Sequence, residues 1–229
     1  MPKISVIIPA YNEGKAIGQT VQYVLKQAGD KISNILVVDG GSSDNTITKA
    51  KQAGAVVLQS PRKGRAVQMN YGAAHAQSAV LYFLHADTLP PRNFALDILK
   101  SVKKGLNAGC FRLSFNSKHP LLQGYAWFTR FNADCFRFGD QSLFITHAAF
   151  DRAGGFREDH IVMEDQEIVR RIKKSEKFIV LSTSVVTSAR RYLDNGVIRL
   201  QLIFTLIYVL YYMEVGQVQL KNIYNRMVT

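Results

Sequence analysis

The chain has 229 residues, 47% of them hydrophobic and 20% charged, a composition that excludes a disordered chain and is long enough for one large domain. Its two cysteines, Cys110 and Cys135, are too few for a disulfide framework or a four-ligand zinc site, which favours a reducing, cytosolic setting. Lys and Arg outnumber Asp and Glu by 29 to 17, and the resulting charge of +12 suits nucleic acid, an anionic membrane surface or a phosphorylated small substrate.

Strand-like and helix-like patterns alternate through the first half of the sequence. Short apolar runs rich in β-branched residues predict strands, and apolar residues at three- and four-residue spacing predict helices. The expected strands cover 4–8, 35–38, 55–58 and 79–84; the expected helices cover 17–28, a segment capped by Ser43-Asp44 and ending at Ala53, 65–77, and one opened by Pro90-Pro91. These repeated units predict an α/β fold with a mostly parallel, twisted sheet flanked by helices.

The second half of the sequence is less regular. We expect strands at 109–115, 143–146 and 179–187, a helix at 163–174 and a long apolar helix at 197–213. The last helix is shorter than the ~20 apolar residues that a membrane-spanning helix needs, and the apolar run at 4–8 is too short for a secretory signal. The sequence therefore predicts a soluble or peripheral protein.

Polar residues follow three of the predicted strands at their carboxyl ends. Asn12 and Glu13 follow the first strand, Asp39 the second, and His85 and Asp87 the fourth. Each residue alone could be a helix cap or a turn former, but open α/β sheets bind their ligands at this edge. Together these residues predict a functional site.

Two charged segments are further candidates for that site. The basic loop 61–65 precedes a predicted helix, where it could bind an anion or form a solvated turn. The acidic segment 163–167 opens a helix with a basic end, which the helix dipole alone explains, although one of its carboxylates could be a base. Neither GxGxxG after the first strand nor GxxxxGK[ST] is present, so a classical dinucleotide fold and a P-loop are not supported.

Four segments of the chain match a known family in the same order, and three more narrow the match. SVIIPAYNE, ILVVDGGSSDNT, LYFLHADT and MEDQEIVRRI resemble glycosyltransferase family 2, with its GT-A nucleotide-diphospho-sugar transferase fold. RKGRAVQMNYGAAHA, GDQSLFIT and SARRY are similar to its arsenosugar-biosynthesis-type branch. The resemblance implies a GT-A domain at 1–195, with a nucleotide-binding half at 1–90 and an acceptor and catalytic half at 91–195. Helices at 196–229 would pack on it or lie at a membrane or dimer surface.

The resemblance also implies roles for the matching residues. Asp165 would be the catalytic base, and Asp87 with His85 would bind Mn²⁺ or Mg²⁺. His85 stands where the family usually has an acid, and Gly40 replaces the second acid of the motif that holds Asp39. The substrate and nucleotide contacts would be Pro9, Ala10, Tyr11, Glu13, Asp39 (on the base), Gly64 and Arg65 (near ribose and diphosphate), Ala86, Glu164, Arg190 and Arg191.

The implied activity is that of an inverting glycosyltransferase. The donor would be a nucleotide-diphosphate sugar, with a UDP-sugar favoured, and the acceptor a small molecule or a lipid. One alternative is a nucleotidyltransferase acting on a sugar phosphate, which would need a glycine-rich basic loop where Ala10 to Glu13 stand. The other is a non-catalytic basic domain that binds nucleic acid. Such a domain would interleave exposed aromatic residues with basic ones, whereas the aromatic residues here fall in apolar segments. We therefore expect that nucleic acid is not a partner of this chain.

The C-terminal segment leaves two interpretations open. From Arg170 to Thr229 it holds ten basic and three acidic residues, and its helix is apolar around much of its circumference. Such a helix is typical of a core or a homodimer interface, but basic residues beside an apolar, Tyr-rich helix also suit anionic lipid headgroups. The expected location is the cytoplasm, with the inner face of the membrane as an option.

Overall fold

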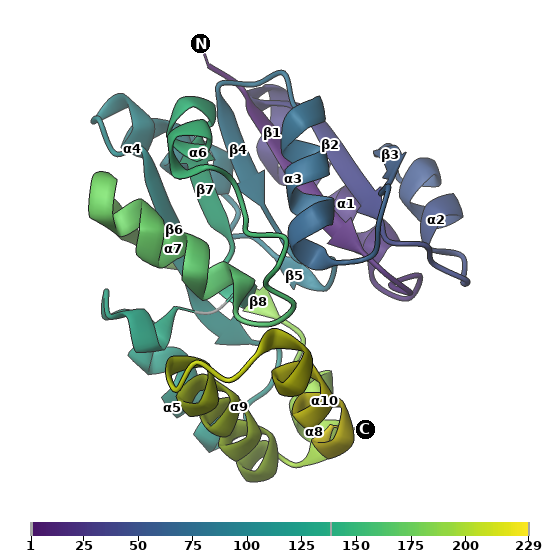
Figure 1. The fold of residues 1–229 in the computed structure, drawn as a ribbon. Helices are drawn as coiled ribbons and strands as arrows, with labels where there is room; N and C mark the ends of the chain where they lie inside the picture. Colours follow the sequence, from purple (N-terminus) through teal and green to yellow (C-terminus); the bar gives the residue numbers. More distant parts are fainter. Residues whose placement is uncertain (1, 138, 229) are drawn as a thin grey trace.

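The computed structural model describes residues 2–137 and 139–228, in which the strands form an eight-stranded sheet with helices on both faces (Figure 1). The strand order is β3-β2-β1-β4-β7-β6-β8-β5. The strands are β1 (Ile4–Ala10), β2 (Ile32–Asp39), β3 (Val56–Gln59), β4 (Val80–Phe83), β5 (Thr88–Leu89), β6 (Ala108–Phe115), β7 (Leu143–Thr146) and β8 (Phe178–Thr187). The strands predicted from the apolar runs are confirmed, with boundaries that shift by one to three residues.

The sheet is mixed. The pairs β1–β2, β1–β4, β2–β3 and β6–β8 are parallel, whereas β4–β7, β6–β7 and β5–β8 are antiparallel. The parallel order of β1, β2 and β4 brings the carboxyl ends of these strands to one edge. β7 runs the other way beside β4, with Leu143 opposite Phe83, so its first residue lies at that same edge. Residues on both sides of the chain's midpoint therefore meet there.

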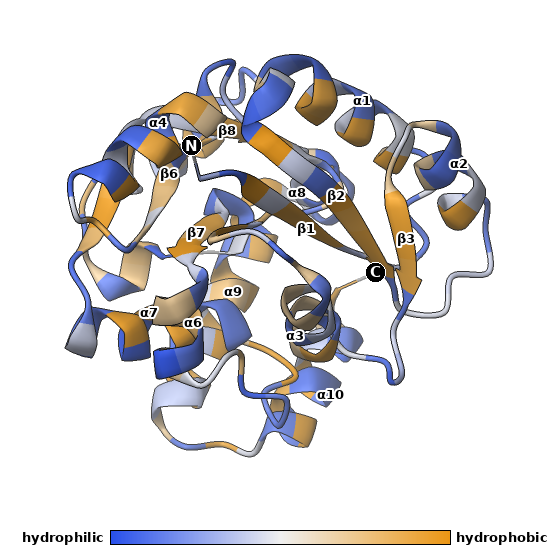
Figure 2. Cartoon of the chain, turned by 90° about the horizontal axis from the view of Figure 1, so that it is seen from above, coloured by the Kyte–Doolittle hydropathy of each residue, from blue (hydrophilic) through white to orange (hydrophobic). Residues whose placement is uncertain are grey.

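The helices cover the two faces of the sheet in separate hydrophobic cores. Along β1, Val6 and Ile8 point into one core and Ile7 points into the other, because successive side chains of a strand face opposite ways. Seen from above, β1 and β2 are apolar strands between helices whose outer sides are hydrophilic (Figure 2). The helices of the first core are α1 (Ile17–Ala28), α2 (Thr46–Gln52), α4 (Phe94–Lys103) and α5 (Pro120–Phe128), and those of the second are α3 (Arg65–His75), α6 (His147–Ala153) and α7 (Glu164–Ser175).

Several details differ from the expectation. The N-cap position of α2 is Asn45, whose side chain makes no capping hydrogen bond. The Asp44 carboxylate, from the predicted Ser43-Asp44 pair, accepts the backbone N–H groups of Thr46, the first residue of α2, and of Gly14 at 3.0 Å each. The segment after Pro90-Pro91 becomes helical only at Phe94. The sequence prediction also missed β5, α5, α6 and the short helices α8 (Arg190–Asn195) and α10 (Gln217–Met227). These elements are short or carry weak apolar periodicity, so only tertiary contacts reveal them.

The C-terminal helices form a small cluster of their own. α9 (Val197–Tyr212) packs on α10 through Ile203, Ile207 and Leu220, and this cluster also receives Val162 and Met163 from the loop before α7. Within the described residues, no helix is long and apolar enough to cross a membrane. The division of the chain at residue 195 stays a prediction.

Candidate active site

A cleft of about 260 Å³ lies at the carboxyl ends of β1 and β4. Residues that follow these strands form one wall, the start of α3 forms a second, and residues of the β8–α9 segment close it. The lining residues are Pro9, Ala10, Tyr11, Glu13, Arg65, Gln68, His85, Ala86, Asp87, Asp140, Thr187, Ser188, Arg191, Tyr192 and Phe204. Most of the residues predicted for the site therefore lie around one cavity.

The remaining predicted residues lie around this cleft without lining it. Asp165 lines a separate small cavity of about 20 Å³ on the far side of His85, which borders both cavities. Glu164 is buried beside Asp165 at the start of α7, and Gly64 is the N-cap of α3 with φ 136°. Arg190 is exposed at the start of α8. Asp39 is buried at the end of β2.

The cleft also holds residues that sequence reasoning missed. All of them except Phe204 are polar: Gln68, Asp140, Thr187, Ser188 and Tyr192. The Gln68 amide donates hydrogen bonds to the backbone carbonyls of Ala10 at 2.9 Å and Val38 at 2.7 Å. Asp140 stands in the segment GDQSLFIT, which served only to narrow the resemblance. The signal for Asp140 in the sequence was that it is the acidic residue of this motif.

His85 is paired with carboxylates on both sides. Its Nδ1 lies 2.7 Å from Asp140 Oδ1, and its Nε2 lies 3.9 Å from Asp165 Oδ2. Burial and the Arg65 charge act to lower the pKa of His85, but the hydrogen bond to Asp140 and the nearby carboxylates outweigh them, and the net shift is upward. The imidazole therefore connects the cleft to Asp165.

Arg65 provides the positive charge that neutralises the acidic start of α7. Its Nη1 lies 3.1 Å from Glu164 Oε1 and 3.6 Å from Asp165 Oδ2. Burial raises the pKa of Glu164 and the Arg65 charge opposes that rise. Arg171 instead pairs with Glu167 one turn along α7, at 2.5 Å. The cation beside the predicted base thus comes from α3 and not from the basic end of α7.

The turn after β2 is organised by the Asp39 carboxylate. Asp39 Oδ2 accepts the backbone N–H groups of Gly41 at 2.8 Å and Ser42 at 3.0 Å. Asp39 Oδ1 is buried and finds no hydrogen-bond partner among the described residues. A buried acceptor without a donor is costly, so this oxygen is available to a ligand's N–H group. The exposed Tyr11 ring follows Ala10, which is paired with Asp39 across β1 and β2, and Lys63 Nζ lies 5.7 Å from the centroid of this ring.

The cleft contains carboxylates but not a complete metal cage. Burial and then the negative charge of Asp87 raise the pKa of Glu13, which indicates that the two carboxylates face the same space. Within residues 2–137 and 139–228, no three His, Cys, Asp or Glu side chains are arranged to hold a metal ion by themselves. Mg²⁺ sites often use only one or two carboxylates and draw their other ligands from water and substrate phosphates. The cleft carboxylates therefore fit a cation whose other ligands are water and the phosphate oxygens of a diphosphate.

Comparison with known sequences assigns the chain to a family. A profile described as Glycosyl transferase family 2 matches residues 5–158, which is more than half of the chain. The chain belongs to glycosyltransferase family 2. The broader part of the resemblance is thereby confirmed, whereas nothing in the comparisons separates the arsenosugar-biosynthesis-type branch from the rest of the family.

Individual relatives of this family 2 chain are distant. It is 33% identical to glycosyltransferase AglE of Haloferax volcanii over 97 residues, which is 39% of this chain and 32% of that protein. It is 27% identical to the probable glycosyltransferase YdaM of Bacillus subtilis over 210 residues, covering 75% of this chain and 47% of YdaM. The chain thus spans a third to a half of the length of these relatives.

Solved structures confirm the GT-A fold. The mannosyltransferase PcManGT of Pyrobaculum calidifontis, in complex with GDP-Man and Mn²⁺, matches with a TM-score of 0.72 at 18% identity, over 94% of this chain and 65% of that one. Residues 1–349 of TarS from S. aureus, in complex with UDP-GlcNAc, match with a TM-score of 0.68 at 19% identity, over 81% of this chain and 58% of that fragment. At these identities the likeness shows the fold alone.

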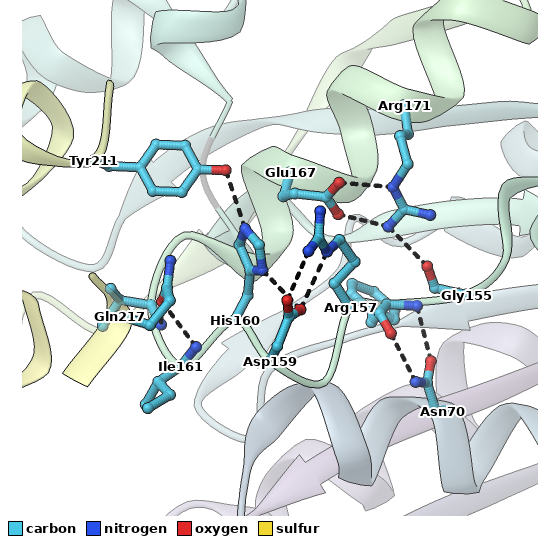
Figure 3. Close-up of polar contacts among 12 residues, drawn as sticks. Asn70, Gly155, Arg157, Asp159, His160, Ile161, Glu167, Arg171, Tyr211 and Gln217 are labelled. Carbon is cyan, nitrogen blue, oxygen red and sulfur yellow. Dashed lines mark hydrogen bonds and ion pairs between the residues drawn. The ribbon is translucent and has the colours of Figure 1, made fainter. Parts of the chain in front are cut away.

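The family 2 match ends at residue 158, and the loop that follows it is held by the C-terminal helices (Figure 3). Gln217 Oε1 of α10 accepts the backbone N–H groups of Ile161 at 2.9 Å and Val162 at 3.0 Å. His160 Nε2 lies 3.3 Å from the Tyr211 hydroxyl of α9, and its Nδ1 lies 3.0 Å from Asp159. This loop leads directly into Glu164 and Asp165, so α9 and α10 help to position the start of α7.

Replacement of Gln217 tests this attachment. Gln217→Leu is expected to speed hydrogen exchange at the amides of Ile161 and Val162, because each lost hydrogen bond costs about 0.5–1.5 kcal/mol. Gln217→Glu keeps an acceptor oxygen and should restore protection. Exchange followed by mass spectrometry on the segment 159–166 measures the effect. Gln219→Leu, an exposed position on the same helix, is the control; equal exchange in both Leu variants would contradict the attachment.

Proposed function

We propose that this chain transfers a sugar from a nucleotide-diphosphate donor to an acceptor hydroxyl with inversion at the anomeric carbon. The observation that carries the proposal is the cleft at the ends of β1 and β4, which brings carboxylates and arginines from distant segments to one cavity beside Asp165. Membership of family 2 supports sugar transfer, and the GDP-Man and UDP-GlcNAc complexes of the structural neighbours support a nucleotide-sugar donor.

Asp165 is the proposed base. Its carboxylate removes the proton of the acceptor hydroxyl as that oxygen forms a bond to the anomeric carbon. The bond from the anomeric carbon to the diphosphate oxygen breaks on the opposite face, and the nucleotide diphosphate leaves with the electron pair. One base is sufficient because the diphosphate leaves without being protonated. Arg65 Nη1 lies 3.6 Å from Asp165 Oδ2 and forms an ion pair with this carboxylate.

Cationic groups of the chain stabilise the leaving diphosphate. Arg65 and Arg191 line the cleft. Burial raises the pKa of Glu13, and the charges of Arg190 and Arg191 oppose that rise. Guanidinium groups donate two parallel hydrogen bonds to phosphate oxygens, so they suit this role. The Arg191 Nη1 also donates to the Tyr224 hydroxyl of α10 at 3.2 Å, which limits the conformations of its side chain.

A divalent cation would supply further charge neutralisation at the diphosphate when bound. Asp87 is the proposed ligand from this chain, because its carboxylate lines the cleft beside Glu13. His85 was predicted as a second ligand, but its Nδ1 is paired with Asp140 and its Nε2 faces Asp165. We therefore assign His85 to holding the two carboxylates. Mn²⁺ or Mg²⁺ remains the proposed cation, since both occur in complexes of structural neighbours.

The proposed donor base is uracil. The buried Asp39 Oδ1 needs a donor, and the imide N–H of uracil is one; the exposed Tyr11 ring offers a surface for stacking. Guanine also has a ring N–H group, so the test below compares the bases directly. The acceptor is proposed to be a small molecule or a lipid that reaches Asp165 past His85.

We further propose that the chain belongs to the arsenosugar-biosynthesis-type branch. The three segments that narrow the resemblance supply cleft residues: Arg65 and Gln68 come from the first, Asp140 from the second and Arg191 from the third. If this branch uses a different acceptor or donor from the rest of the family, its own motifs are expected to line the substrate cavity.

A thermal-shift screen tests the donor and the cation. UDP, GDP, ADP and dTDP are each added with and without Mn²⁺, and UDP with Mn²⁺ is expected to give the largest shift. At about 100 times its dissociation constant a ligand adds about 2.7 kcal/mol of stability. Asp87→Asn should remove the part of the shift that depends on Mn²⁺, while Asp151→Asn, an exposed acid on α6, should not. The absence of any nucleotide shift would contradict the proposed function.

A further inference from the structure

The outer side of α9 is an exposed apolar stripe. Ile198, Leu202, Leu206, Val209 and Met213 recur at three- and four-residue spacing and so lie on one side of the helix. Their exposed fractions are 60%, 64%, 39%, 47% and 68%. We call these five residues the α9 stripe. Contiguous exposed apolar surface of this kind marks an interaction site, because water contact with it is unfavourable.

The opposite side of α9 already has its partners. Leu200, Ile203 and Ile207 are buried, and the last two pack against Leu220 of α10. The helix is therefore apolar on both sides but needs only one of them for the fold. A soluble helix that served the fold alone would carry polar residues on the side facing water. The α9 stripe is thus unexplained by the folding of this chain.

Exposed aromatic residues extend the apolar surface away from α9. Trp127, Phe128 and Phe131, from the end of α5 and the turn after it, are each close to half exposed, and Trp127 packs edge-on against the other two rings. Phe136 stacks on Phe128, with ring centroids 5.4 Å apart. Asp134, two residues before Phe136, pairs with Lys173 of α7 at 2.7 Å, and Arg170 of the same helix lies against Tyr212 of α9. We call Trp127, Phe128 and Phe131 the α5 aromatic cluster. The second half of α7 therefore connects this cluster to the Tyr212 end of α9.

An arginine lies beside the aromatic rings at each apolar feature. The Arg130 guanidinium lies 4.4 Å from the centroid of the Trp127 ring, and the Arg170 guanidinium lies 5.6 Å from that of Tyr212. Arg199 on α9 and Lys221 and Arg226 on α10 are exposed as well. Apolar side chains beside aromatic rings and exposed arginines match the headgroup region of an anionic bilayer. A second copy docked face to face would instead bring these like charges together.

The length and place of α9 also suit a helix that lies in a bilayer surface. Its 16 residues are too few to span the hydrocarbon core, which needs about 20. Phe204, on the inner side of the same helix, lines the cleft. The α9 stripe is thus separated from the cleft by one helix, which is about 10–12 Å thick. A bilayer at the stripe would therefore lie one helix away from the cleft.

We propose that the α9 stripe and the α5 aromatic cluster dock onto an anionic lipid bilayer, with the apolar side chains at the level of the headgroups and the arginines on lipid phosphates. The proposal concerns where the chain works and does not rest on its activity. It goes beyond sugar transfer, because a family 2 enzyme with a soluble acceptor needs no such surface. Docking onto a bilayer also explains why the outer side of α9 is apolar as well as its buried side.

Vesicle sedimentation with the full chain tests the proposal. Vesicles of phosphatidylcholine with 30% phosphatidylglycerol (a composition chosen as about one anionic lipid in three) should retain the protein, and pure phosphatidylcholine should retain it at least tenfold less. Raising the salt concentration should weaken the retention, because screening shortens the range of the arginine–phosphate attraction.

Paired variants identify the surface. The double variant Leu202→Glu/Leu206→Glu is expected to reduce binding to anionic vesicles at least tenfold. The matched control is Leu25→Glu/Leu96→Glu, on α1 and α4, where both side chains are 38% exposed and lie outside the stripe. Circular dichroism and the melting temperature establish that both double variants are folded.

Three results would overturn the proposal. The first is no binding of the unmodified chain to anionic vesicles, and the second is equal binding by the stripe and control variants. The third comes from sedimentation velocity: a dimer of the unmodified chain that the stripe variant converts to a monomer, without vesicle binding, would assign the stripe to a second copy. Because none of these measurements uses a donor or an acceptor, failure here leaves the proposed sugar transfer to its own test.

Discussion

Asp165→Asn is expected to lower the rate of sugar transfer by about 10²–10⁴-fold, the usual contribution of a general base. The amide has the shape of the carboxylate but cannot take the proton of the acceptor hydroxyl. Asp165 borders the small cavity behind His85 and not the main cleft, so the nucleotide should bind with unchanged affinity. Steady-state rates with the donor found in the thermal-shift screen, together with the nucleotide shift itself, separate the two effects.

The same substitution at two other acids provides the comparison for Asp165→Asn. Asp151→Asn removes an exposed carboxylate on α6 and should leave transfer unchanged. Asp140→Asn keeps a hydrogen-bond acceptor for His85 but removes the charge of the 2.7 Å pair, so we expect a smaller loss than for Asp165→Asn. Transfer by Asp165→Asn at the rate of the unmodified chain would remove Asp165 from the mechanism.

Gly139→Ala is expected to reduce transfer as severely as loss of the base itself. A Cβ atom built on Gly139 would overlap Asp165 Oδ2, and it would lie 2.6 Å from Asp165 Cγ and 3.0 Å from His85 Cε1. Since real Cβ atoms do not approach so closely, the methyl group must displace the Asp165 carboxylate from His85. Displacement of a catalytic group by about 1 Å can cost about 10²-fold in rate.

Gly124→Ala is the matched control, because a Cβ atom at this position of α5 meets nothing within 4 Å. It should retain full transfer and raise the free energy of unfolding by up to about 1 kcal/mol, since alanine favours a helix over glycine. Rates and urea unfolding are measured for both variants. If Gly139→Ala were folded and fully active, the close approach of Gly139 to Asp165 would have no functional importance.

The first half of the fold could be predicted because its signals are local. β1, β2 and β4 are continuous apolar runs, and their polar ends must meet because parallel strands deliver their carboxyl ends to one edge. Glu13, His85 and Asp87 were therefore correctly expected to share a cavity. The predicted contact of Asp39 with a base stays a prediction.

The pairing of Asp140 with His85 could not be predicted, because it depends on the direction of a strand. The run Leu143–Thr146 indicates a strand but not whether it runs parallel or antiparallel to its neighbour. β7 is antiparallel to β4, with Leu143 opposite Phe83, so residues before β7 lie beside residues after β4. That arrangement places Asp140 beside His85, although the two residues are 55 positions apart in the sequence. No local pattern contains this information.

The sequence by itself determined the apolar strands, their polar ends and the presence of a long apolar helix near the C-terminus. Only the tertiary structure decided which side of that helix is buried. α9 is apolar around its circumference, so periodicity cannot distinguish Ile203, which packs on α10, from Leu202, which is exposed. The physical reason is that burial depends on what packs against a side chain, and for α9 the partner is an element whose position is set by contacts along the whole chain.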